Sequence, residues 1–153
     1  MLQLSYPLIV NSPQATHLTA EQLWTGLLLR VMEPMRFTVG LDRADVAQID
    51  DETFERVLYF GGHEISDEVK LVHAHSVLFT TVANAHAPQG RLRYEIQNHV
   101  EQGLVLLCEY QTEFPEPDDD ESRQLLEMVK NAYRMADEEM LRIIREESLL
   151  ARH

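Results

Sequence analysis

The chain has 153 residues, of which 26 are acidic and 13 basic, and its formal net charge is −13 at pH 7. A surface this acidic repels phosphate backbones and anionic lipid heads, which argues against nucleic-acid and membrane partners. The length and composition favour one soluble domain over residues 1–153. The absence of a signal sequence or apolar span, together with the single cysteine, favours a cytoplasmic location.

The N-terminal third predicts one strand followed by two short helices. Residues 2–10 alternate as a strand does, and a turn cluster follows. Thr19 and Gln22 have the spacing of a capping box, which opens a helix that carries Trp24 on its apolar face. Pro34 ends this helix, and residues 35–37 predict a second helical turn.

Residues 42–114 alternate with a period of two, which predicts a series of strands in sequential, meander-like connection. The clearest break is Gly61-Gly62, because two residues able to adopt positive φ suit a tight hairpin turn. Together with the first strand this gives about seven strands. The predicted runs are residues 42–50, 53–60, 63–73, 77–82, 91–99 and 104–114.

The last third predicts one long amphipathic helix over residues 122–148, capped by the acidic run before it. Its apolar residues recur at intervals of three and four, and we expect them to pack on the sheet with a ligand pocket in between. These residues are Leu125, Leu126, Val129, Ala132, Tyr133, Ala136, Met140, Ile143 and Ile144.

Three segments of the chain are informative together, namely LTAEQLWTGL at residues 18–27, RVLYFGG at residues 56–62 and DEVKL at residues 67–71. They resemble the SRPBCC superfamily, also called START-like, and most closely its AtaL-like branch. The resemblance implies an α+β helix-grip fold, a seven-stranded curved antiparallel sheet wrapped around a long C-terminal helix, with a deep cavity between them. Members of the superfamily bind lipids, hormones or polyketides, and some catalyse cyclisation. The resemblance carries no catalytic motif over to residues of this chain.

A hairpin about Gly61-Gly62 places Arg56 opposite Asp67 on a face that also holds Leu58 and Ile65. Charges on an apolar face must pair with each other or bind something. The pair is therefore either a polar anchor for a ligand or an ordinary cross-strand ion pair at the sheet margin. A register slip of one residue would turn it to the other face.

Aromatic and sulfur-containing side chains complete the predicted ligand-binding set. If Tyr94 and Tyr110 face the final helix, they offer hydroxyls inside an apolar pocket, to which Tyr133 and Met140 of that helix also contribute. The alternative is that the tyrosines are core residues with their hydroxyls at the rim.

No pattern in the sequence indicates a cofactor, a metal site or catalytic residues. The seven histidines lack the spacing of metal ligands, and Cys108 on an apolar strand is typical of a buried, inert thiol. The first hypothesis is therefore a non-enzymatic protein that binds a small hydrophobic or aromatic metabolite.

Two further hypotheses stay open. One is a polyketide cyclase or aromatase in which Arg56 polarises a carbonyl and Asp67 or a tyrosine moves a proton. The other concerns an interface, because Met128 and Met135 lie on the flank of the final helix, where they could serve a homodimer contact.

Overall fold

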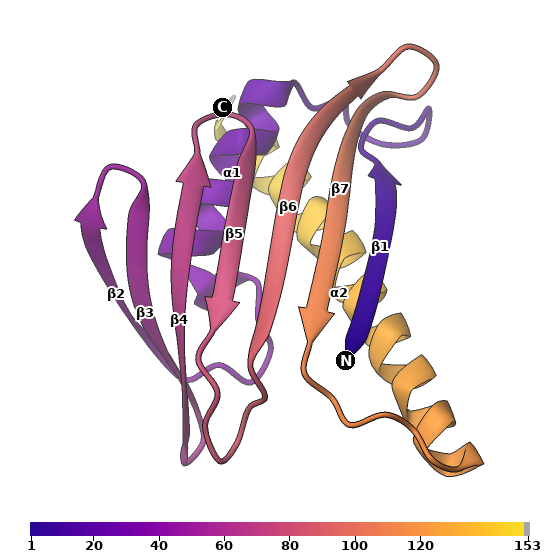
Figure 1. Cartoon of the computed structure of the whole chain (residues 1–153). Coiled ribbons are helices and arrows are strands. Elements are labelled where there is room, and N and C mark those ends of the chain that lie inside the picture. Colours follow the sequence, from indigo (N-terminus) through magenta and orange to yellow (C-terminus); the bar gives the residue numbers. More distant parts are fainter. Residues whose placement is uncertain (152–153) are drawn as a thin grey trace.

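The computed structural model describes residues 1–151 and shows one curved antiparallel sheet with both long helices on the same face (Figure 1). This is the predicted α+β helix-grip fold. The elements are β1 (Leu2–Ile9), α1 (Ala20–Met32), the 3₁₀ turn η1 (Pro34–Arg36), β2 (Arg43–Asp50), β3 (Thr53–Phe60), β4 (His63–Val72), β5 (Ser76–Thr81), β6 (Gly90–His99), β7 (Gly103–Thr112) and α2 (Asp120–Ala151).

The strands lie in the order β1-β7-β6-β5-β4-β3-β2, so every strand after β1 pairs with its neighbour in sequence. β1 pairs with β7 and forms the edge of the sheet opposite β2. In Figure 1 α1 lies behind the middle strands, whereas α2 crosses behind β6, β7 and β1. The predicted strand ends differ from the observed ones by at most two residues.

The β3–β4 hairpin has the predicted register, with Arg56 opposite Asp67 and Phe60 opposite His63. Gly61 has a φ of 58°, which side chains disfavour, as the sequence predicted. The same prediction for Gly62 is wrong, because its φ is not positive. This difference fits a type II′ turn, in which only the first central residue needs positive φ.

The first helix, α1, begins with the predicted capping box. The amide of Gln22 donates to the Thr19 hydroxyl at 3.1 Å, and the Thr19 amide donates to the Gln22 side chain at 2.9 Å. Trp24 is 6% exposed and belongs to the core. Gly26 lies against α2, since a Cβ there would be 2.4 Å from the Cγ2 atom of Ile144. A glycine therefore permits the close crossing of the two helices.

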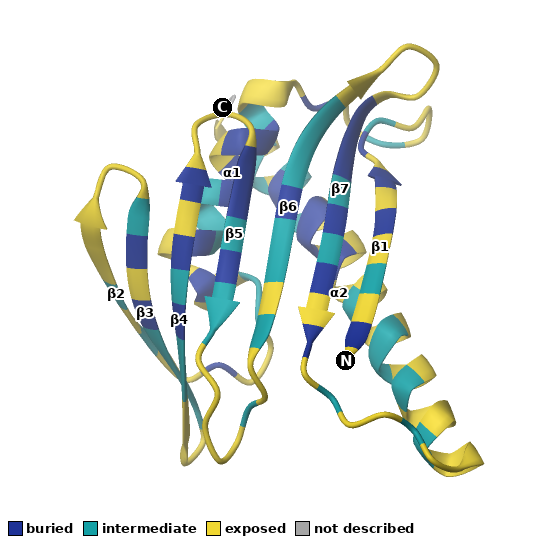
Figure 2. Ribbon diagram, viewed as in Figure 1, coloured by how far each residue is buried: buried dark blue, intermediate teal, exposed yellow. Residues whose placement is uncertain are grey.

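The N-terminal half of α2 differs from the prediction, because its apolar stripe is largely not buried. Leu125 is 60% exposed, and Ala132 and Ala136 are exposed as well (Figure 2). The helix begins at Asp120 beyond the end of the sheet (Figure 1), so its first turns have no strand to cover. Met128 and Met135 are also exposed, and the dimer contact proposed for them stays a prediction.

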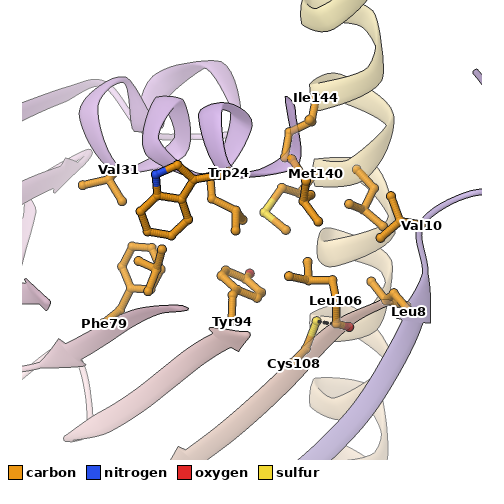
Figure 3. Packing of buried hydrophobic residues seen from close by; sticks show 14 of the residues in the cluster. Leu8, Val10, Trp24, Val31, Phe79, Tyr94, Leu106, Cys108, Met140 and Ile144 are labelled. Carbon is orange, nitrogen blue, oxygen red and sulfur yellow. Dashed lines mark hydrogen bonds between the residues drawn. The ribbon is translucent and has the colours of Figure 1, made fainter. Parts of the chain in front are cut away.

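The core fills the space between the sheet and the C-terminal half of α2. Figure 3 shows Met140 and Ile144 of α2 converging with Trp24 of α1 on side chains of the central strands. Met140 is 1% exposed and Tyr94 is fully buried. Side chains therefore fill the region between the sheet and the C-terminal half of α2.

Candidate functional site

The most unusual feature of the interior is a buried carboxylate, Asp137 of α2, that accepts hydrogen bonds from three tyrosines. Its side chain is 1% exposed. Tyr94 donates to Oδ1, and both Tyr6 and Tyr110 donate to Oδ2, the last at 2.6 Å. Both carboxylate oxygens are therefore satisfied by protein groups, as a buried charge requires.

The phenols of this cluster stay protonated at neutral pH. Burial raises the pKa of Tyr6, Tyr94 and Tyr110, and the neighbouring Asp137 raises each further. Burial likewise raises the pKa of the Cys108 thiol, which lies beside the same cluster. Three neutral hydroxyls donate to one carboxylate, and among residues 1–151 no cation is hydrogen-bonded to this network.

The sheet brings the three tyrosines together because their strands are neighbours. Tyr6 in β1 and Tyr94 in β6 both lie opposite Cys108 of β7, and Tyr110 is two residues further along β7 on the same face. Tyr94 and Tyr110 are among the residues predicted from the sequence, whereas Tyr6 and Asp137 are not. Asp137 lies four residues after Tyr133 and three before Met140, so an acid on the apolar stripe was the available signal.

A hollow of about 270 Å³ opens beside this cluster, between the sheet and α2. Tyr133 of α2 stacks on Tyr110 with the ring centroids 4.3 Å apart and the planes 3° from parallel. Tyr110 thus borders the hollow with its ring and binds Asp137 with its hydroxyl. The lining includes Ile65, Thr81, Leu92, Tyr110, Phe114 and Tyr133.

Arg56 and Asp67 form the predicted pair, and their hydrogen bonds are made to each other and to the protein backbone. The Arg56 Nε and Nη2 atoms donate to the two Asp67 oxygens at 2.9 and 2.6 Å, while Nη1 donates to the Val31 carbonyl at 3.2 Å. Both side chains are 6% exposed. Neither residue lines the hollow, so the pair ties β3 and β4 to the end of α1.

Arg30, near the end of α1, is a second arginine on this face and has a different environment. Its Nε atom is buried without a hydrogen-bond partner. The guanidinium carbon lies 5.8 Å from the ring centroid of Phe79 and 5.7 Å from that of Tyr94. The sequence analysis did not identify Arg30, because a basic residue in the last turn of a helix is ordinary.

The predicted ligand-binding residues therefore divide into two groups. Tyr110 and Tyr133 line the hollow together. The other four are buried in the core or in ion pairs, and they are Arg56, Asp67, Tyr94 and Met140. The hydroxyls of Tyr94 and Tyr110 reach the interior and not the rim. A role of any of the six in ligand binding stays a prediction.

A larger recess of about 780 Å³ lies between α1 and the C-terminal turns of α2, and two of the carboxylates at its edge, Glu33 and Glu147, already pair with Arg36. Within residues 1–151, no three metal-binding side chains gather. Nor does any helix in that range have the length and apolar character needed to cross a membrane.

A curved seven-stranded sheet held against a long C-terminal helix defines a helix-grip protein. Within this class, residues 4–148 match the family described as acetylaranotin biosynthesis cluster protein L, so the chain belongs to this AtaL family. No curated protein matches the sequence.

Solved structures with the same fold include polyketide aromatase/cyclases. The di-domain aromatase/cyclase StfQ from the steffimycin biosynthetic pathway aligns with a TM-score of 0.68 and 9% identity over 94% of this chain and 49% of that one. This chain therefore spans about half the length of StfQ. The Zhui aromatase/cyclase from Streptomyces sp. R1128 aligns with a TM-score of 0.59 and 15% identity over 95% and 91%.

A third similar structure is that of a protein of unknown function, SA2116 from Staphylococcus aureus. It aligns with a TM-score of 0.61 and 12% identity over 97% of this chain and 96% of that one. At these identities the similarities show the shared fold alone.

Proposed function

We propose that this protein binds a small hydrophobic or aromatic metabolite in the hollow between the sheet and α2. The observation that carries the proposal is the parallel stack of Tyr110 and Tyr133 at the edge of an open, mainly apolar space. Flat apolar rings pack well on such aromatic walls, and a few polar groups behind them fix orientation.

The size of the hollow limits the ligand. About 270 Å³ is just below the usual range of about 300–1,000 Å³ for small-molecule pockets. One or two rings fit this space better than a long acyl chain does. Leu92 and Ile65 supply the apolar floor, and Tyr133 is only partly buried, so the entrance lies beside α2.

Binding of the dye ANS tests this proposal. Leu92→Trp should fill the hollow and Tyr133→Ala should remove one wall, so both should weaken ANS binding to the native protein. Tyr59→Ala is the matched control, because Tyr59 lies on the outer face of the sheet and bonds Asp45. Unchanged affinity in both hollow variants would place the dye elsewhere and contradict the proposal.

A second candidate function is a cyclase-type enzyme, favoured by the convergence of three phenols on Asp137 beside the hollow. An intramolecular aldol cyclisation needs one group that takes a proton from carbon and one that donates to the carbonyl oxygen, and it needs no oxidant. Arg56 and Asp67 bind each other, so the Asp137 cluster is the better source of these groups.

The two functions predict different outcomes with a reactive ligand. A β-polyketone thioester should be bound unchanged by a binding protein, whereas an enzyme should convert it to an aromatic product that absorbs in the near ultraviolet. Asp137→Asn should abolish that conversion. Product formation at the buffer rate in wild type would leave binding as the function.

A further inference from the structure

The inner face of the sheet holds two buried carboxylates, and each is fully engaged without Arg30. Asp67 receives two hydrogen bonds from Arg56. Asp137 receives three from tyrosines. Within the described residues 1–151, neither a hydrogen bond nor an ion pair joins Arg30 to any protein group, and its Nε atom is buried.

An arginine in this position normally has a direct partner. Guanidinium groups removed from water need hydrogen-bond acceptors, because an unpaired buried charge is destabilising. The faces of Phe79 and Tyr94 give Arg30 cation–π contacts, which offset part of that cost but accept none of its N–H donors. Arg30 as a whole is half-buried, and its buried Nε atom lacks an acceptor among residues 1–151.

Arg30 does not itself line the hollow, but the strand register connects its two aromatic contacts with Leu92, which does. The Arg30 guanidinium lies over Phe79 and Tyr94. Phe79 pairs with Leu92, which lines the hollow, and Tyr94 is two residues from Leu92 on the same face. Side chains two residues apart on one strand face are about 7 Å apart. A ligand with its ring beside Leu92 thus has Arg30 within reach of a substituent.

We propose that Arg30 binds the anionic group of the ligand, so that the hollow selects aromatic carboxylates over neutral aromatic compounds of the same shape. This inference rests on the proposed binding function and adds the ligand's charge. A guanidinium binds a carboxylate through two parallel hydrogen bonds, and such bonds are stronger where water is excluded. Because the chain's net charge is −13, an anion needs a positive group near the hollow. Arg91 of the lining is exposed to solvent, whereas the Nε atom of Arg30 is buried and has no hydrogen-bond partner in the described part of the chain.

The competing explanation is that Arg30 only balances the charge of Asp137 at longer range. In that case Arg30 would affect stability, and neutral and anionic ligands of one shape would bind alike. The two explanations therefore differ in ligand preference and not in the cost of removing the arginine.

The test compares 2-naphthoic acid with 2-naphthamide, which has nearly the same shape and no charge. Calorimetric or fluorescence titration of wild type should show at least about tenfold tighter binding of the acid, or about 1.4 kcal/mol. In Arg30→Gln this preference should fall to about one while the affinity for the amide stays unchanged. Arg30→Lys should keep part of the preference, because lysine retains the charge without the planar fork.

Arg142→Gln is the matched control, since it removes one exposed positive charge far from the hollow and should leave the preference intact. Equal binding of acid and amide by wild type, or a preference that persists in Arg30→Gln, would overturn the role of Arg30 and leave the binding function standing. If neither compound binds wild type up to its solubility limit, the proposed function fails and the inference fails with it.

Discussion

The coupling of Arg56 and Asp67 should have a large effect on stability. Both side chains are 6% exposed and share two hydrogen bonds of 2.9 and 2.6 Å. Arg56→Ala leaves the Asp67 carboxylate buried without its partner, which costs about 3–5 kcal/mol of unfolding free energy. Asp67→Ala leaves the guanidinium in the same position, with only the Val31 carbonyl as an acceptor.

The double variant removes both charges, so it should be more stable than the sum of the two single losses implies. We expect a coupling energy of at least about 2 kcal/mol from urea unfolding followed by circular dichroism. The exposed pair of Glu139 and Arg142 on α2 is the control, and its coupling should be about 0.3–0.5 kcal/mol. If the effects at Arg56 and Asp67 add within about 0.5 kcal/mol, the pair is not coupled and the argument from burial is wrong.

Three further measurements test the turn, the core and the Asp137 cluster. Gly61→Val should lower the free energy of unfolding by about 1–3 kcal/mol in urea titrations. Gly62→Val should lower it clearly less, because, of these two glycines, only Gly61 has a positive φ. Equal losses of stability in the two variants would contradict this. Trp24→Ala should cost about 3–5 kcal/mol, whereas an unchanged urea midpoint would mean that Trp24 is not core. The three phenols that bind Asp137 have raised pKa values, so above pH about 10 the folded protein retains protons that the unfolded chain loses. Stability should then fall as the pH rises, by up to roughly 1.4 kcal/mol per pH unit for each phenol, and tyrosinate absorbance that reaches its full value before unfolding would refute this.

Local patterns in the sequence predict the fold well, because few strand registers and helix boundaries are compatible with them. The two-residue turn at Gly61 fixes the β3–β4 register, and alternation then decides which side chains face the helices. The capping box at Thr19 marks the start of α1 within one turn. These signals concern neighbours in sequence or across one hairpin, so a single chain contains enough information to find them.

The prediction for α2 shows where local patterns mislead. The apolar stripe continues along the whole helix, yet α2 begins beyond the end of the sheet, as Figure 1 shows. Amphipathicity predicts which face is apolar, whereas burial depends on how far the partner extends. Leu125 therefore carries the same pattern as Met140 but is exposed.

The candidate site was harder to predict because its central residue looks like part of a charged helix surface. Asp137 precedes Glu138 and Glu139, and such a run normally faces solvent. Only its position on the stripe distinguishes it, and the tyrosines that bind it come from the β6–β7 hairpin and from β1, which is far from that hairpin in sequence. Convergence of this kind depends on sheet order, which single-residue patterns do not contain.

The buried polar groups of the inner face can be ranked by what remains unsatisfied. Arg56 and Asp67 satisfy each other, so a ligand would have to break two short hydrogen bonds to use either one. Asp137 is also saturated, but by hydroxyls that can rotate toward a new acceptor at lower cost than a guanidinium pair can separate. Among the residues that the structure describes, none is hydrogen-bonded to the Arg30 side chain, so Arg30 has no such bond to lose. A ligand that enters beside Tyr133, as proposed, would therefore gain most from Arg30, less from the tyrosine hydroxyls and least from the ion pair.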